Sequence, residues 1–215
     1  MSGINPNAWH NFYHCVGGTY GTWLCGDPRG FRSYQHRTHV DGDYKNLPPE
    51  GVYAPIFEYS LKQLKYPPVK LTVIQRQILC HAMIQRMLDD ECEPIALAIE
   101  INHFHLLARF VPMQMNQRNQ HSDAIIHDGR DPAPRHYLGR ARQAGSYALG
   151  QRKLKPQSPV WGLRPGCKPI RSRDHQLKVA RYIKRHNDHG AAVWHIKLGF
   201  LFDVNRLARE PDPGG

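Results

Sequence analysis

Two histidines separated by one residue could present their imidazole rings to the same cation. His103 and His105 lie in the largely apolar stretch EINHFHLLARF, residues 100–110. If this stretch is a β-strand, both side chains project from one face about 7 Å apart, while Phe104 points into the core. Two imidazoles do not complete a metal site, so another segment must supply a further ligand. The alternative is two polar residues without a metal, since the chain contains 14 histidines.

A tyrosine and a histidine one helical turn apart form a second candidate. In VARYIKRHND, Tyr182 and His186 are four residues apart, so they would share one face of a helix. A tyrosine one turn from a potential ligand is what a metal-assisted nucleophile requires. The alternative is a structural helix, on which Tyr182 packs half-buried against a sheet and His186 is exposed.

The strands that would position the histidine pair are predicted from aromatic and β-branched residues. A glycine-interrupted strand is expected over residues 9–24. The apolar stretch 93–111 is expected to break into two antiparallel strands at 100–102. A hairpin is expected over 158–172, with its turn at 164–166.

Helices are predicted from apolar residues at helical spacing. The strongest pattern covers 72–91, where Thr72 and Gln75 fit a capping box. Two more helices are expected over 136–154 and 173–190. Together with the strands, they predict an α+β fold: an antiparallel β-sheet with helices on it.

The whole chain is predicted to be one domain, residues 1–215. Two polar stretches, 27–68 and 113–135, are interpreted as irregular insertions, the first with a short helix near 58–64. The tail 209–215 is expected to be disordered.

Charge and cysteine usage limit the class of partner and the compartment. The formal charge of +11 favours a polyanionic partner, most simply nucleic acid. The five cysteines are scattered and form no CxxC pair, so a disulfide framework is not expected. This cysteine usage instead predicts a protein of the reducing cytoplasm. There is no apolar run long enough for a transmembrane helix, and the N-terminus lacks the pattern of a secretory signal.

Three stretches together resemble a known family. NHFHLL resembles the PNHVHLL strand of single-tyrosine HUH transposases, which include the REP-associated tyrosine transposases and related small insertion-sequence transposases. VWGLRPGCKPIRSRDHQLKVARYIKRHND is similar to the family's tryptophan-containing hairpin and tyrosine helix, and FYHCVGGTYGTWL looks like its opening strand. The resemblance covers most of residues 9–195. It departs from the family where EIN replaces MPN and where His186 replaces glutamine or asparagine.

The resemblance implies a ferredoxin/RRM-like HUH endonuclease fold and a role for each matching residue. Tyr182 would be the nucleophile, and His103 and His105 would bind Mg²⁺ or Mn²⁺ with His186 or Asn187. The implied substrate is single-stranded, hairpin-forming DNA, cut and rejoined through a 5′-phosphotyrosine. A nucleoid-associated protein in the cytoplasm is expected, with a monomer and a homodimer both left open.

Basic residues provide candidate contacts to DNA phosphates. Two lie beside the tyrosine and four lie further upstream: Lys178, Arg181, Arg140, Arg142, Arg152 and Lys153. The alternative is that they form ordinary solvated faces.

Two other functions remain open from the sequence. One is a catalytically inactive relative that binds hairpin single-stranded DNA without cutting it, which the departures at EIN and HND keep open. The other is an RRM-like RNA-binding domain in which the spacing of the two histidines is incidental.

Overall fold

The computed structural model describes residues 11–28, 51–112, 133–163 and 165–209. Most of both expected insertions and the tail after residue 209 lie outside these ranges. The described part contains an antiparallel six-stranded sheet in the order β4-β1-β3-β2-β5-β6. The predicted α+β class is therefore confirmed.

The elements follow one another along the chain as β1, α1, α2, β2, β3, α4, β4, α5, η2, β5, β6 and α6. The strands are β1 (Phe12–Gly18), β2 (Glu93–Ile99), β3 (His103–Arg109), β4 (Gly166–Pro169), β5 (Ala192–His195) and β6 (Gly199–Phe200). The helices are α1 (Ala54–Lys62), α2 (Val73–Asp89), α4 (Ala133–Gln151), α5 (Arg173–Arg185), the 3₁₀ helix η2 (His186–His189) and α6 (Val204–Arg209). No helix in the described ranges is both long and apolar enough to cross a lipid bilayer.

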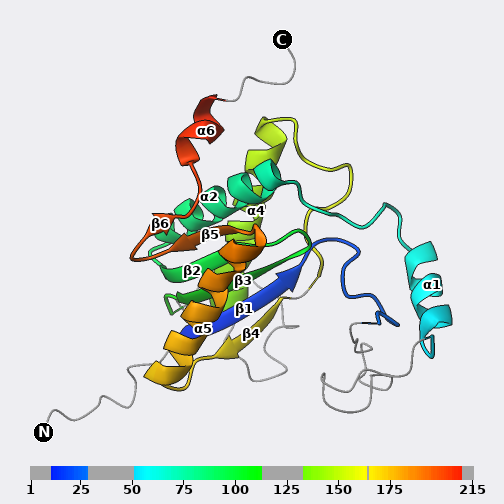
Figure 1. Ribbon diagram of the computed structural model, residues 1–215, viewed down its shortest axis with the longest axis horizontal. Coiled ribbons are helices and arrows are strands. Elements are labelled where there is room, and N and C mark those ends of the chain that lie inside the picture. The colour runs from blue at the N-terminus through cyan, green and yellow to red at the C-terminus, as the bar shows by residue number, and fades with distance from the viewer. Residues whose placement is uncertain (1–10, 29–50, 113–132, 164, 210–215) are drawn as a thin grey trace, which may run out of the picture.

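Helices cover both faces of the sheet. Figure 1 shows α5 across the near face, with α2 and α4 behind the sheet. Side chains along β3 point alternately toward the helices on one face of the sheet and toward those on the other. Phe104 and Leu106 are buried in the large core with α2 and α4, whereas Leu107 is buried in a smaller core with α5. The histidine pair therefore belongs to the face that α5 covers.

Local signals place the starts of α2 and α5. Thr72 accepts a hydrogen bond from Gln75 N, and the Gln75 side chain accepts one from Thr72 N, so the predicted capping box is confirmed. Ser172 caps α5 by accepting from His175 N. The predicted helix 173–190 changes to 3₁₀ geometry after Arg185 and ends at a left-handed Gly190.

The predicted hairpin over 158–172 is wrong. Its second arm is β4, which pairs with β1, while Trp161 in the first arm bridges Thr19 just beyond the end of β1. The backbone N–H of Gly162 donates to the carbonyl of Gly18, so both arms lie along one chain segment instead of along each other. The expected turn at 164–166 includes residue 164, which lies outside the described residues, and Gly166 is already the first residue of β4. Turn residues do not specify which strand each arm pairs with.

Three other boundaries differ from the prediction. The first strand, expected over 9–24, ends at Gly18, and left-handed residues at Gly21 and Trp23 then redirect the chain. The short helix expected near 58–64 is α1, which begins four residues earlier at Ala54. Helix α4 begins at Ala133, inside the expected irregular insertion.

Candidate functional site

The two predicted halves of the site meet between β3 and α5. Strand β3 lies between β1 and β2, so its histidines lie near the middle of the sheet. Helix α5 packs on this face through the buried residues Val179, Ala180 and Ile183. Tyr182 on α5 and His186 at the start of η2 are four residues apart, and both lie against His105. The ring centroid of His105 is 5.1 Å from that of Tyr182 and 4.9 Å from that of His186.

The phenol of Tyr182 reaches the histidine pair. Its Oη lies 3.4 Å from Nε2 of His105, a long hydrogen bond. The Tyr182 residue is 40% exposed, so solvent or a substrate can reach it. A nucleophile of this kind needs both features, access to the substrate and a fixed position beside the ligand nitrogens.

Three imidazoles gather around this contact. The ring centroids are 5.0 Å apart for His103 and His105, 4.9 Å for His105 and His186, and 6.2 Å for His103 and His186. The structure therefore brings together the three histidines that were predicted to bind a metal. Asn187, the alternative ligand, is exposed on η2.

Two of these rings are held through Nδ1 by residues of the sheet and its turn. His103 Nδ1 donates to the amide oxygen of Asn102 at 2.9 Å. His105 Nδ1 lies 3.2 Å from Nε2 of His14 in β1, and the two rings are stacked. Such partners fix the orientation of a ring and leave its other nitrogen for a ligand or a proton.

The third ring is held by a carboxylate. His186 Nδ1 lies 2.7 Å from Oε1 of Glu100, and the two side chains are only 13% and 12% exposed. Nε2 of His186 is buried and has no hydrogen-bond partner among the described residues. A buried imidazole nitrogen without a partner is unfavourable unless something else occupies its lone pair.

Burial keeps the centre of the cluster uncharged at neutral pH. Desolvation, with smaller contributions from His103 and His14, lowers the pKa of His105 to about 3. Desolvation and the charge of Lys168 lower the pKa of His14 to about 4. Neutral imidazoles are the form that coordinates a cation.

The donor set fits a divalent cation in type. As the side chains stand, no group of three or more His, Cys, Asp or Glu in the described ranges is arranged to hold a metal ion. Three imidazoles and an unpartnered His186 Nε2 nevertheless match the nitrogen ligands of transition metals. The rings would have to rotate for one cation to contact His103, His105 and His186 together. Metal binding therefore stays a prediction.

The six predicted DNA contacts do not lie together. Lys178 and Arg181 share α5 with Tyr182, and with Lys184 and Arg185 they border a shallow hollow of about 580 Å³ on its outer surface. Asp188 also borders this hollow, which is open to solvent, whereas Tyr182 does not line it. These four cations form the basic face of α5.

The other four lie on or just after α4, across the sheet from Tyr182. Arg140 forms an ion pair with Asp90 at 2.9 Å. Arg142 donates to the Gly162 carbonyl and lies 5.5 Å from the centroid of the Trp161 ring. Burial lowers the pKa of Arg142 to about 10. Arg140 and Arg142 thus have structural partners, which their sequence did not indicate.

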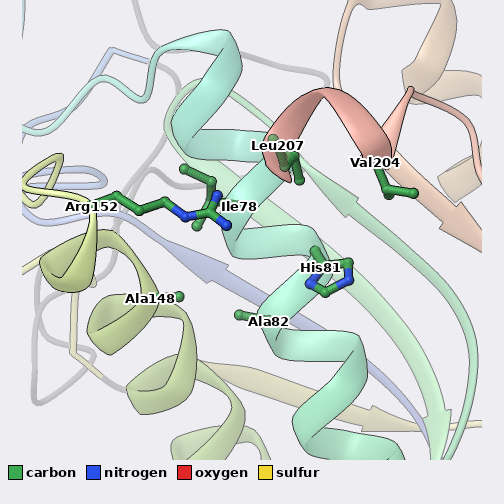
Figure 2. A pocket seen from close by; sticks show the side chains of 7 residues that line it. All are labelled: Ile78, His81, Ala82, Ala148, Arg152, Val204 and Leu207. Atoms are coloured by element: carbon green, nitrogen blue, oxygen red, sulfur yellow. The ribbon is translucent and has the colours of Figure 1, made fainter. Parts of the chain in front are cut away.

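Arg152 lies beside a separate cavity, and Lys153 follows it after the end of α4. The cavity, of about 170 Å³, is bordered by α2, α4 and α6 (Figure 2). Apart from Arg152 and His81 its lining is apolar: Ile78, Ala82, Ala148, Val204 and Leu207. None of the histidines near Tyr182 lines it, so this cavity is not part of the site.

The sequence reasoning missed His14 and Glu100 as members of the site. His14 lies in a correctly predicted strand, and alternation would have put it on one face. Only the pairing of β1 with β3, however, puts it beside His105. Glu100 was noted as a change in the turn before the histidines, but its partner is 86 residues further along the chain.

Comparisons with known proteins leave the family of the chain open. No family model matches the chain, and no curated protein does. A solved structure of a REP-associated tyrosine transposase bound to a REP hairpin is similar, with a TM-score of 0.41 and 13% sequence identity. That match covers 84% of this chain and 68% of the other. At this level of similarity, function has to be argued from the site itself.

Proposed function

We propose that this protein is a single-tyrosine enzyme that cuts and rejoins single-stranded DNA through a 5′-phosphotyrosine, the reaction of a transposase. The observation that carries the proposal is the contact between Tyr182 Oη and His105 Nε2 at 3.4 Å. This contact brings an exposed phenol next to the buried, uncharged imidazole of His105, and the basic face lies on the same helix as the phenol.

The reaction conserves the energy of the phosphodiester bond. Tyr182 Oη attacks the phosphorus, a P–Oη bond forms, and the bond from phosphorus to the 3′ oxygen breaks. The leaving oxygen takes up a proton and becomes a free 3′-OH. Attack by this or another 3′-OH on the phosphotyrosine reverses the step and joins DNA.

The histidine cluster has to orient the reacting phosphate. A divalent cation held by His103, His105 and His186 would polarise a phosphoryl oxygen and stabilise the charge that develops on it. If Nε2 of His105 were to bind the cation, the phenol proton would leave to solvent, which reaches the side chain of Tyr182. Lys178 and Arg181 then neutralise the flanking phosphates.

A covalent adduct tests this proposal. The purified protein is incubated with end-labelled hairpin single-stranded DNA and Mn²⁺, and the products are separated on a denaturing gel. The expected result is a protein–DNA band that is absent for Tyr182→Phe and present for the matched control Tyr147→Phe, an exposed tyrosine on α4. Binding without any adduct would instead favour the inactive hairpin-binding protein.

A further inference from the structure

The turn between β2 and β3 carries an acidic residue that the proposed reaction does not use. Glu100 follows β2, and its backbone N–H donates to the carbonyl of His103 at 2.8 Å, which closes this turn. Its side chain extends toward α5 and contacts His186 Nδ1 at 2.7 Å. The same short turn therefore holds the first histidine of β3 through its backbone and the histidine of η2 through its side chain.

The contact determines which nitrogen of a neutral His186 carries hydrogen. A carboxylate only accepts hydrogen bonds, so Nδ1 must be the donor. Nε2 of the neutral ring is then left with its lone pair, and this is the buried nitrogen that has no partner in the described part of the chain. A carboxylate that accepts from a ligand histidine in this way fixes the tautomer and the ring orientation.

We propose that Glu100 is a positioning residue: it holds His186 as the Nδ1–H tautomer, so that Nε2 is available to a divalent cation shared with His103 and His105. The inference rests on the proposed function for the identity of the metal ligands. It assigns to this chain's Glu100-Ile101-Asn102 turn a role in preparing the site before DNA binds. Glu100 itself does not touch the reacting atoms.

Burial argues against an incidental surface pair. The side chains of Glu100 and His186 are 12% and 13% exposed. Glu93 and Arg109 form an ion pair between β2 and β3, at the ends of these strands that lie away from the turn. Their side chains, by contrast, are 56% and 49% exposed. Exposed pairs orient their partners weakly because solvent competes for both groups. Glu93 is therefore a matched control from the same strand pair.

The test uses the full chain without DNA. Long-range ¹H–¹⁵N spectra of the histidine rings in metal-free buffer report the tautomer of His186, and calorimetric titration with Mn²⁺ reports affinity. For Glu100→Ala we expect His186 to lose the pure Nδ1–H form and the Mn²⁺ dissociation constant to rise about 10- to 100-fold. Glu100→Gln keeps an oxygen acceptor and should retain most of the tautomer and affinity. Glu93→Ala should change neither.

A double-mutant cycle separates positioning from a general effect on folding. In a His186→Ala background, adding Glu100→Ala should cause no further loss of Mn²⁺ affinity, because the residue it positions is gone. An equal loss in both backgrounds would overturn the proposal and make Glu100 a ligand or a structural residue. An unchanged His186 tautomer in Glu100→Ala would also overturn it, as would a wild-type chain that binds no Mn²⁺.

Failure of the proposed function gives a different pattern. The wild-type protein could bind Mn²⁺ through His186 in a way that depends on Glu100 but form no DNA adduct. This result would support the positioning role of Glu100 and contradict the strand-transfer reaction. If the adduct forms normally in Glu100→Ala with unchanged Mn²⁺ affinity, the reaction stands and the positioning role falls.

Discussion

The hydroxyl of Tyr182 lies 3.4 Å from Nε2 of His105, although 77 residues separate them in the chain. The contact exists because α5 packs on the face of the sheet from which the histidines of β3 project. It joins the two halves of the site and determines which substitutions should abolish chemistry without abolishing binding.

Loss of one imidazole should separate catalysis from binding. His103→Ala removes a predicted metal ligand but leaves the basic face of α5 intact. We expect adduct formation to fall by at least about 100-fold, the scale for removing one group that stabilises transition-state charge. Affinity for single-stranded DNA, measured by fluorescence anisotropy, should change less than about threefold, well below one tenfold step in affinity. An equal loss of affinity would mean that His103 supports the fold or the DNA surface instead.

Acid should destabilise the metal-free protein through its buried histidines. The pKa of His14 is about 4 and that of His105 about 3 in the folded chain, below the ordinary value near 6.5. Between about pH 6.5 and 4 the unfolded chain binds more protons, so the free energy of unfolding falls as pH falls. Above that window this contribution is fully present. One buried histidine contributes at most about 1.4 kcal/mol per pH unit.

Urea denaturation in EDTA at pH 7, 6 and 5 measures this dependence. The variant His14→Gln should show a shallower decline than the wild type, whereas His189→Gln, at an exposed position, should not. Identical slopes for the wild type and His14→Gln would show that His14 is not held neutral by burial.

The basic face of α5 should dominate the salt dependence of DNA binding. Removing Lys178 and Arg181 together should lower the slope of log K against log salt by about 1.4, since each single-strand phosphate contact contributes about 0.7. The pair Arg152→Ala and Lys153→Asn removes the same charge across the sheet, and asparagine tolerates the left-handed backbone of Lys153. That control should leave the slope unchanged. A larger change in slope for the control pair would show that DNA binds on the other face of the sheet.

One glycine of β1 is required by packing. A Cβ at Gly17 would lie 2.5 Å from Cε1 of Phe104, a fully buried ring. Gly17→Ala should therefore lower the free energy of unfolding by about 1–3 kcal/mol. At Gly139 in α4 there is open space where a Cβ would lie. Gly139→Ala should therefore raise the free energy of unfolding by about 0.5–1 kcal/mol. Urea denaturation measures both, and an unchanged stability for Gly17→Ala would contradict this packing.

Local patterns in the sequence predicted the elements that position the site. The capping box at Thr72, the two antiparallel strands on either side of residues 100–102 and the helix that carries Tyr182 are confirmed. Each depends on interactions within a few residues, such as capping hydrogen bonds and alternation along a strand. The single-domain division and the metal site are not tested by the structure and stay predictions.

Contacts between distant segments could not be predicted in the same way. The arms of the expected hairpin pair with β1 and Thr19 instead, and Glu100 meets His186 only because α5 ends above the β2–β3 turn. The charge of Arg142 suggested DNA, but the Gly162 carbonyl and the Trp161 ring occupy its guanidinium. Residue type alone does not show whether a cation faces solvent or another part of the chain.

The site of covalent attachment tests the central claim most directly. The adduct with single-stranded DNA is treated with nuclease and digested at aspartate, which releases residues 174–187 with Tyr182 as their sole tyrosine. Tandem mass spectrometry should find the nucleotide 5′-phosphate on Tyr182. A nucleotide on any other residue, or an adduct of undiminished yield in Tyr182→Phe, would contradict the account.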